Sequence, residues 1–265
     1  METKLSTARF KARLRAFRDA RAKKYKKYAA LHNEVTESEK VKVGFSNKRI
    51  KRNGDLVDMP PEFAIVLKSC EEFIENKDRF PGLRDFGGFA MNRKDSRRRT
   101  AEVMAVLLAR TELIEGRTGV PTKSGMDTVS DHTLMEDYAL RFGKTISPSS
   151  FQTCINRLKR AGYHRREHIT AAVANQEAVM QIRSAASYKQ WTPDFFKDLN
   201  VTSYKEVSDF IQLTRNRQIK QGYIFKWKTF ISLVKGIAAT HMAYSKKTKA
   251  DILRLNEPTL NELPI

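Results

Sequence analysis

SDHTLMEDYALRFGKTISPSSFQTCINRLKRAGYHRREH, the stretch from Ser130 to His168, determines the expected fold. Ser130 or Asp131 can cap a first helix there, because a short polar side chain accepts a hydrogen bond from a free N–H group at a helix start. Gly143 is suited to end that helix, and Ser147-Pro148 supplies a cap and a first-position proline for another. The sequence therefore predicts two helices joined by a few residues.

The expected second helix has one apolar face and one polar face. Its apolar positions lie within about 100° of one another when each residue advances by about 100°, and they are Phe151, Cys154, Ile155 and Leu158. The opposite face carries hydroxyls, carboxamides and guanidiniums without a carboxylate, and its members are Ser149, Gln152, Thr153, Asn156, Arg157 and Arg160. Such side chains hydrogen-bond to base edges and phosphates in a major groove. We expect Asn156, Arg157 and Arg160 to lie nearest the bases.

Basic residues follow the second helix directly. Gly162 ends that helix, and Tyr163, His164, Arg165 and Arg166 come next. A small β-ribbon beginning here would place Arg165 and Arg166 against the DNA backbone. Helix, short turn, capped helix and basic wing together describe a winged helix-turn-helix, whereas the alternative is a plain hairpin of two core helices.

His164 to His168 also matches the H-x-x-E-H pattern of inverted zinc peptidases. That chemistry needs both histidines on one helix turn beside a third ligand, with the glutamate polarising a metal-bound water. Here the motif follows a helix-ending glycine and encloses Arg165 and Arg166, whose charges disfavour a dication. We therefore expect a basic strand that contacts phosphate, and no metal site.

Other enzyme signatures are missing from the sequence. It contains no G-x-x-x-x-G-K-[ST], G-x-G-x-x-G or G-x-S-x-G run, and its five histidines form no H-x-H pair for metal-assisted strand nicking. We therefore predict a binding protein that is not an enzyme and uses no cofactor. A nuclease or peptidase built on the His164 to His168 cluster is the alternative.

The composition indicates a polyanionic partner. The 265 residues include 50 Lys and Arg against 30 Asp and Glu, for a net charge of +20, and 40% of them are hydrophobic, which is enough for a core. Cys70 and Cys154 lie far apart, which indicates buried thiols in a reducing compartment. The longest apolar runs, such as residues 104–109, are too short to cross a bilayer. We expect a cytoplasmic protein without membrane contacts.

The amino-terminal part of the chain is strongly basic. From Leu5 to about Val35 the sequence has no Gly or Pro and a heptad-like apolar spacing, which predicts a long helix. Eleven basic residues lie between Met1 and Lys27, so this helix is either an arm that binds a polyanion or a solvated helix packed on the body. Residues 37–61 form a linker or an exposed hairpin, and a domain boundary is expected near residue 60.

Residues 61–190 are predicted to form the DNA-binding domain. Pro61 and Glu62 open a short helix, and Ser96 can cap a later one whose first turn holds Arg97, Arg98 and Arg99. Cations oppose the dipole at a helix start, so we expect these three arginines to contact an outside anion, with a solvated run as the alternative. Residues 170–187 are rich in alanine and favour a helix.

Residues 191–265 are predicted to form a basic helical region with three further helices. Between Phe210 and Ala250 there are nine Lys or Arg and no Asp or Glu, interleaved with aromatic residues. Such a mixture can grip phosphates and stack on unpaired bases, although the aromatic residues can equally form helix core. We expect backbone contacts from Lys226 and Lys228.

These residues resemble RepA-type replication initiators of theta-replicating bacterial plasmids. The resemblance covers about residues 85–249 and rests on the arginines before an apolar helix, the run ending at Gly143, the L-x-x-x-G-Y close at Leu158 to Tyr163, and WTPDFFKDLNVT from Trp191. It implies a winged-helix protein that binds its plasmid's origin and helps a host initiator and replicative helicase to assemble on melted DNA. The chain departs from the family in its first eighty residues and in its mildly acidic end, NEPTLNELPI from Asn256.

The sequence thus predicts a mainly α protein with a winged helix-turn-helix core, a long basic N-terminal helix and additional C-terminal helices. Its expected function is sequence-specific binding of double-stranded DNA at a plasmid origin, with self-association as a further possibility. The alternatives are a winged-helix transcriptional repressor, and a protein held on nucleic acid by charge alone without sequence preference. The acidic end is a candidate site for recruiting a host protein.

Overall fold

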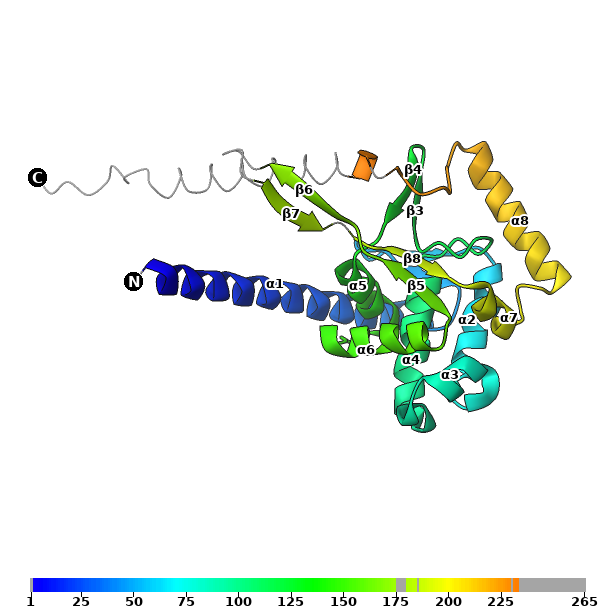
Figure 1. Cartoon of the computed structure of the whole chain (residues 1–265). Helices are drawn as coiled ribbons and strands as arrows, with labels where there is room; N and C mark the ends of the chain where they lie inside the picture. Colours follow the sequence, from blue (N-terminus) through cyan, green and yellow to red (C-terminus); the bar gives the residue numbers. More distant parts are fainter. Residues whose placement is uncertain (1, 175–179, 185, 230, 234–265) are drawn as a thin grey trace, which may run out of the picture.

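The computed structural model describes residues 2–174, 180–184, 186–229 and 231–233, and the described part is mainly helical (Figure 1). The first half of the chain contains α1 (Glu2–Ser38), β1 (Lys48–Ile50), β2 (Leu56–Asp58), α2 (Glu62–Glu72), η1 (Lys77–Arg79), α3 (Pro81–Phe86), η2 (Phe89–Asn92), α4 (Lys94–Leu108), β3 (Gly119–Thr122) and β4 (Gly125–Thr128). The second half contains α5 (Asp131–Phe142), α6 (Pro148–Arg160), β5 (His164–Glu167), β6 (Thr170–Ala174), β7 (Met180–Ser184), β8 (Tyr188–Trp191), α7 (Pro193–Leu199) and α8 (Lys205–Lys220).

The described strands form antiparallel pairs. β1 pairs with β2 and β3 with β4, each as a local hairpin. β5 pairs with β8, so that His164 lies opposite Trp191, and β6 pairs with β7, so that Thr170 lies opposite Ser184. Since β6 and β7 lie between β5 and β8 in the sequence, the four strands make one long two-stranded ribbon with a bend in the middle.

The core is built around α4. Every residue of α4 from Thr100 to Leu108 is buried, because this helix packs against α2 on one side and against α5 and α6 on the other. Trp191 and Phe195 complete the core from the far end of the ribbon, with their rings stacked 3.9 Å apart. Tyr25 of α1 belongs to the same cluster, so all three predicted regions of the chain contribute to one core.

Most of the helices predicted from capping residues and apolar spacing are present in the structure. The predicted long N-terminal helix, the short helix after Pro61 and the two capped helices between Ser130 and Ala161 are all present. Residues 37–61 contain the hairpin β1–β2, one of the two forms expected. α4 begins at Lys94, with Arg93 as its N-cap, so Ser96 lies inside the helix and does not cap it. Most of the third C-terminal helix, and the acidic end, lie outside the described residues.

The prediction of a helix within residues 170–187 is wrong. The described parts of this segment are the strands β6 and β7, which pair over five residues each. Alanine favours helices by less than 1 kcal/mol per residue over most other residue types, and pairing between distant strands outweighs so small a preference. The segment instead prolongs the ribbon that β5 and β8 begin.

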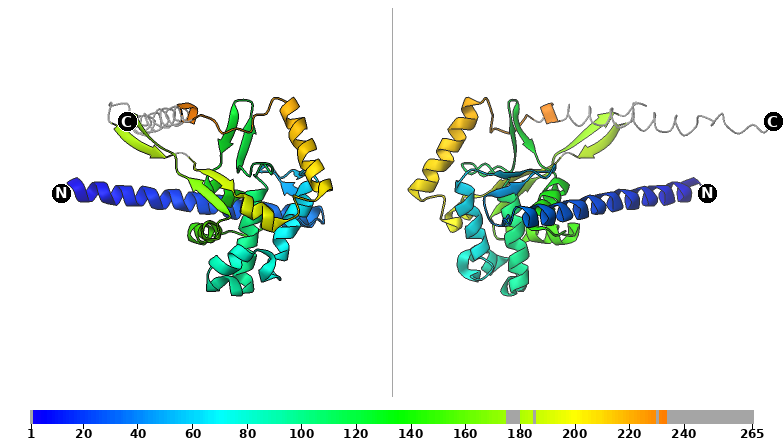
Figure 2. Two further views of the ribbon diagram at one scale, coloured as in Figure 1. Left: turned by 45° about the vertical axis from the view of Figure 1, so that its right-hand side comes forward. Right: turned by 180° about the vertical axis from the view of Figure 1, so that it is seen from behind.

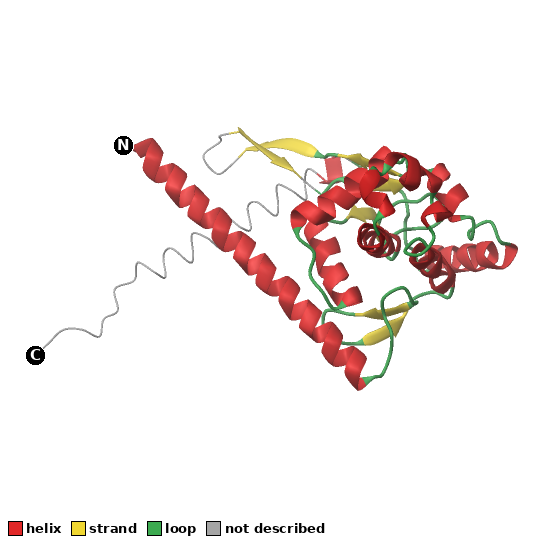
Figure 3. Ribbon diagram, turned by 90° about the horizontal axis from the view of Figure 1, so that it is seen from below, coloured by secondary structure: helices red, strands yellow, loops and turns green. Residues whose placement is uncertain are grey.

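Two elements project from the same side of the body. The N-terminal part of α1 and the β6–β7 end of the ribbon point in the same general direction in all views (Figures 1, 2 and 3). α8 lies at the opposite edge of the molecule. The molecule therefore has one side with long projections and another that ends in a single helix.

Candidate nucleic-acid interface

α6 is fixed at both ends by local hydrogen bonds. The Ser147 hydroxyl accepts a hydrogen bond from the Ser150 N–H at 3.1 Å, and Pro148 occupies the first turn. At the other end Gly162 takes a φ of +75°, which lets the chain leave the helix and enter β5. The predicted cap, proline and terminating glycine are all confirmed, so the orientation of α6 follows from its sequence.

The two faces of α6 are divided as the sequence predicted. Phe151, Cys154, Ile155 and Leu158 are buried. On the opposite face Ser149, Thr153, Asn156 and Arg160 are exposed, and they lie within about 60° of one another on the helix. No carboxylate occurs between Tyr138 and Arg166, whereas seven Lys and Arg do. The exposed face therefore combines hydrogen-bonding groups with uncompensated positive charge.

Four of the predicted α6 residues, Ser149, Gln152, Thr153 and Asn156, already have hydrogen-bond partners. Gln152 donates from Nε2 to Asn156 Oδ1 at 3.0 Å, and its Oε1 accepts from Arg166 Nη1 at 3.4 Å. Gln152 thus connects the helix to β5 and is less free to contact a ligand than Arg160, and the Thr153 hydroxyl donates to the Ser149 carbonyl at 2.9 Å. Arg157 is half-buried at the edge of the same face.

A partly buried ion cluster joins the ribbon to α5. Asp131, in the first turn of α5, accepts from Arg166 of β5 at 2.8 Å and lies 3.3 Å from Lys189 of β8. Lys189 is 1% exposed and also donates to the Val129 carbonyl at 2.5 Å. Burial lowers the pKa of Lys189, and the neighbouring Asp131 carboxylate acts in the opposite direction. The ribbon therefore leaves the body at an angle set by α5.

His164 and His168 are separated by the structure. His164 lies on β5 against Trp191, 3% exposed, whereas His168 is exposed beyond the end of the strand. Burial, together with the charges of Lys189 and Arg166, lowers the pKa of His164 to about 3. Among the described residues no three His, Cys, Asp or Glu side chains are grouped so that they would hold a metal ion.

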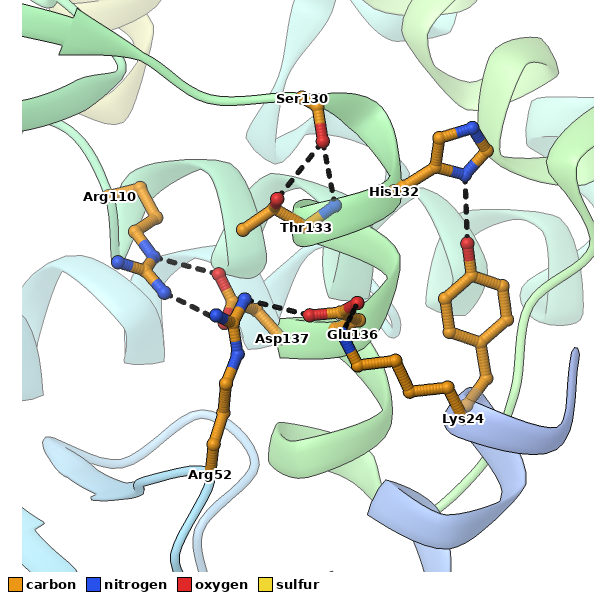
Figure 4. A network of polar contacts seen from close by, with 9 residues as sticks. Lys24, Arg52, Arg110, Ser130, His132, Thr133, Glu136 and Asp137 are labelled. Carbon is orange, nitrogen blue, oxygen red and sulfur yellow. Dashed lines mark hydrogen bonds and ion pairs between the residues drawn. The ribbon is translucent and has the colours of Figure 1, made fainter. Parts of the chain in front are cut away.

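α1 is held on α5 by a polar network (Figure 4). Lys24 of α1 and Arg52 of the β1–β2 hairpin each lie 2.7 Å from a different oxygen of the Glu136 carboxylate. Tyr25 Oη lies 2.9 Å from His132 Nδ1, on the same face of α5. Burial, and then the charge of Arg21, lowers the pKa of His132. The second half of α1 is therefore part of the body.

The first half of α1 is different, because its described side chains face solvent. Lys11, Arg15 and Arg18 are exposed, as are their neighbours Ala16 and Ala20. No ion pair to these three basic residues is present among the described residues. The helix thus carries its charge away from the body, on the side where the ribbon also projects (Figure 3).

The three arginines of α4 do not share one environment. Arg97 was expected on the surface, but it is 8% exposed, and its guanidinium donates to the carbonyls of Ile74, Met91 and Asn92 at 2.9–3.0 Å. It therefore closes the core, and two of its three guanidinium nitrogens donate to backbone carbonyls. Arg98 and Arg99 are exposed, and Thr100, the residue after Arg99, donates from its hydroxyl to Cys154 Sγ of α6 at 3.9 Å, so Arg99 lies near α6.

The other basic residues predicted to contact the DNA backbone are also of two kinds, exposed or held in an ion pair. Arg165 is exposed on β5, whereas Arg166 is the partner of Asp131. Lys226 is exposed, whereas Lys228 forms an ion pair with Asp127 of β4 at 2.6 Å. The surface beside α6 thus includes Arg165 and Arg99, and Lys226 and Lys228 lie along β4, where the Met126 N–H donates to the Lys226 carbonyl at 2.8 Å.

Sequence reasoning missed several residues of this region. Lys159 is an exposed cation at the edge of the α6 polar face, and it was passed over because its position also borders the apolar face. Lys189 gave no signal, because a lysine in a short strand is ordinarily solvent-exposed. The partners of Lys189 and Arg166 on α5 are distant in sequence, so only the fold brings them together.

Comparisons of the chain with protein-family models, with curated proteins and with solved structures give no significant match. Within the part of the chain that the structure describes, no helix combines the length and apolar character that a bilayer crossing requires.

Proposed function

We propose that the protein is a site-specific binder of double-stranded DNA that inserts α6 into the major groove. The observation that carries the proposal is the exposed face of α6, on which Ser149, Thr153, Asn156 and Arg160 lie together opposite a fully buried apolar face. Carboxamide and guanidinium groups at this spacing match the acceptors and donors of base edges. A hairpin of two core helices also has a polar outer face, but here that face lacks carboxylates, which favours a polyanionic ligand.

The finer fold assignment belongs to the same proposal. We assign α5, the short turn and α6 as a helix-turn-helix, and the β5–β8 and β6–β7 ribbon as its wing. The Asp131, Arg166 and Lys189 cluster supports this assignment, because it ties the base of the ribbon to the first helix of the pair. Arg165 and Arg99 flank α6 and supply phosphate contacts.

Selection from a pool of random duplexes tests the proposal. The bound duplex is then titrated in competition with a scrambled one over a range of salt concentrations. We expect the selected duplex to bind at least about a thousandfold more tightly than the scrambled one. Equal binding of both, with a steep fall in affinity at high salt, would show that charge alone holds the protein on DNA.

The biological role proposed for this activity is initiation of plasmid replication, and it rests on the resemblance of residues 85–249 to RepA-type initiators. A repressor of the same fold would use the same face of α6, so DNA binding does not separate the two roles. Opening of the DNA strands distinguishes an initiator from a repressor. We expect the protein to make an adjacent AT-rich segment of a supercoiled origin plasmid reactive to permanganate, and a protein that binds without opening the duplex would be a repressor.

A further inference from the structure

α8 has an apolar stripe that the body does not cover. The helix packs through Val207 and Ile211, which are 2% and 8% exposed. Phe210 and Leu213 point away from that contact and are 44% and 46% exposed. Large apolar side chains grouped in this way on a helix surface commonly mark an interface, because their exposure to water is unfavourable.

Opposite charges stand at the two ends of the stripe. Glu206 lies one turn before Phe210 and Arg217 one turn after Leu213, and both are exposed. All four residues lie within about 60° of one another on the helix. No ion pair to Glu206 or Arg217 is formed with any described residue. The stripe therefore reads, along the helix, as negative, apolar, apolar and positive.

Two copies of this stripe are complementary when they lie antiparallel. A twofold axis between Phe210 and Leu213, with two copies of α8 antiparallel, places Phe210 of one copy against Leu213 of the second. The same axis places Glu206 of each copy against Arg217 of the other, so one set of four residues forms two apolar contacts and two ion pairs. We propose that α8 is the interface through which two copies of this chain associate.

The position and charge of α8 are compatible with this partner. The helix lies at the edge of the molecule opposite to the projecting parts of α1 and the ribbon, so two copies joined there keep both basic sides free (Figure 2). Its exposed charged residues are nearly balanced, with Lys205, Arg217 and Lys220 against Glu206 and Asp209. A single helix pair buries less than a standard interface of about 1,600 Å², so the dimer is weak, with a Kd on the order of 10 µM.

The test is sedimentation equilibrium of the full chain without DNA, at about 0.15 M salt and from about 1 to about 200 µM. We expect a monomer–dimer equilibrium for the wild type. Glu206→Arg and Arg217→Glu should each raise the dimer Kd at least about tenfold, because each places like charges together twice. The double variant exchanges the charges, and its Kd should return to within about threefold of the wild-type value.

Lys205→Glu is the matched control, because it changes the charge of α8 by as much as Arg217→Glu but lies about 120° from Arg217 on the helix. It should leave the Kd unchanged. A wild type that stays monomeric throughout, a double variant that fails to recover, or a control that weakens the dimer equally would overturn the proposal. Affinity for a non-specific duplex should be equal in all these variants, which separates this interface from the proposed DNA-binding face of α6.

Discussion

At the scale of single residues, environment separates side chains that look alike in the sequence. Arg166 pairs with Asp131, whereas no described residue pairs with Arg160. Arg97 is enclosed by three carbonyls, whereas Arg98 next to it is exposed and has only a 4.0 Å contact with the exposed Asp95. When three arginines are consecutive, the sequence alone does not indicate which of their side chains is buried. Only those that remain in solvent are available to a polyanion.

The Arg97 environment predicts a loss of stability on substitution. Arg97→Ala should lower the free energy of unfolding by about 2–4 kcal/mol, because it removes a buried guanidinium and leaves backbone carbonyls without donors. Arg98→Ala should change it by less than about 0.5 kcal/mol. Urea denaturation of both variants measures the difference. An unchanged stability in Arg97→Ala would contradict this role.

His164 predicts a dependence of stability on pH. Its pKa in the folded protein is about 3, below the ordinary value near 6.5 expected for the unfolded chain, so protons bind the unfolded state preferentially. The free energy of unfolding is therefore undiminished by this group above about pH 6.5 and falls as the pH drops towards 3. At pH 5 the loss from this residue is about 2 kcal/mol.

His164→Leu tests this dependence. Neither ring nitrogen of His164 has a hydrogen-bond partner among the described residues, so leucine removes no such bond. Urea denaturation at pH 7.5 and pH 5 should show a smaller loss on acidification in the variant, by about 2 kcal/mol. His132 also has a lowered pKa, but it contributes equally to both proteins. If acidification lowers the free energy of unfolding equally in both proteins, His164 is protonated in the folded state at pH 5.

At the scale of elements, what could be predicted depended on the distance between interacting residues. The caps of α5 and α6 lie next to the helices that they begin, so Ser130, Ser147 and Pro148 were sufficient to place both. The ribbon depends on pairing between β5 and β8, with a second strand pair between them, and alanine-rich residues 170–187 favoured a helix instead. The faces of α6 were predicted from periodicity, but the ion cluster that orients the ribbon was not, because it needs Asp131, Arg166 and Lys189 from three separate elements.

The contact between α1 and α5 depends on Gly143. This residue has a φ of +65°, and a Cβ added there would come within 2.6 Å of His32 Cδ2 on α1. His32 cannot move away freely, because its Nδ1 donates to the Leu140 carbonyl at 2.8 Å. Gly143→Ala should therefore lower the free energy of unfolding by about 1 kcal/mol, because alanine is strained in the left-handed conformation. It should lower it further by disturbing the packing of α1 on α5.

Gly162→Ala is the matched control for that substitution. Gly162 has a φ of +75°, but a Cβ there would meet nothing within 4 Å. Thermal and urea denaturation should show that Gly143→Ala loses at least about 1 kcal/mol more than Gly162→Ala. If the two variants lose the same amount, α1 does not press against α5 at this point.

At the scale of the whole molecule, positive charge and projecting elements share one side. The exposed part of α1 and the ribbon extend in the same direction, while α8 with its nearly balanced charges lies at the opposite edge (Figure 1). The exposed cations Lys11, Arg15 and Arg18 lie on α1 and Arg165 lies on β5, with the exposed carboxylates Asp19 and Glu167 on the same two elements. This distribution of the net charge of +20 is compatible with the DNA-binding face proposed on α6 and with the association of two copies proposed at α8.

This arrangement predicts the salt dependence of DNA binding. Replacing Lys11, Arg15 and Arg18 by glutamine keeps the helix but removes three exposed cations of the arm. The slope of log K against log salt should become shallower by up to about 2.7, as expected for three lost phosphate contacts. Lys205→Gln on α8 should leave the slope unchanged. An unaltered slope in the triple variant would place the arm away from DNA.

The measurement that tests the central claim most directly compares Arg160→Ala with Lys159→Ala. Both variants lose one exposed cation from α6, but only Arg160 lies in the middle of the polar face. Dissociation constants are measured for the selected and the scrambled duplex at one salt concentration. Arg160→Ala should lose about 1–3 kcal/mol on the selected duplex and much less on the scrambled one, whereas Lys159→Ala should weaken both equally. If the ratio of the two constants changes equally in the two variants, α6 does not read bases.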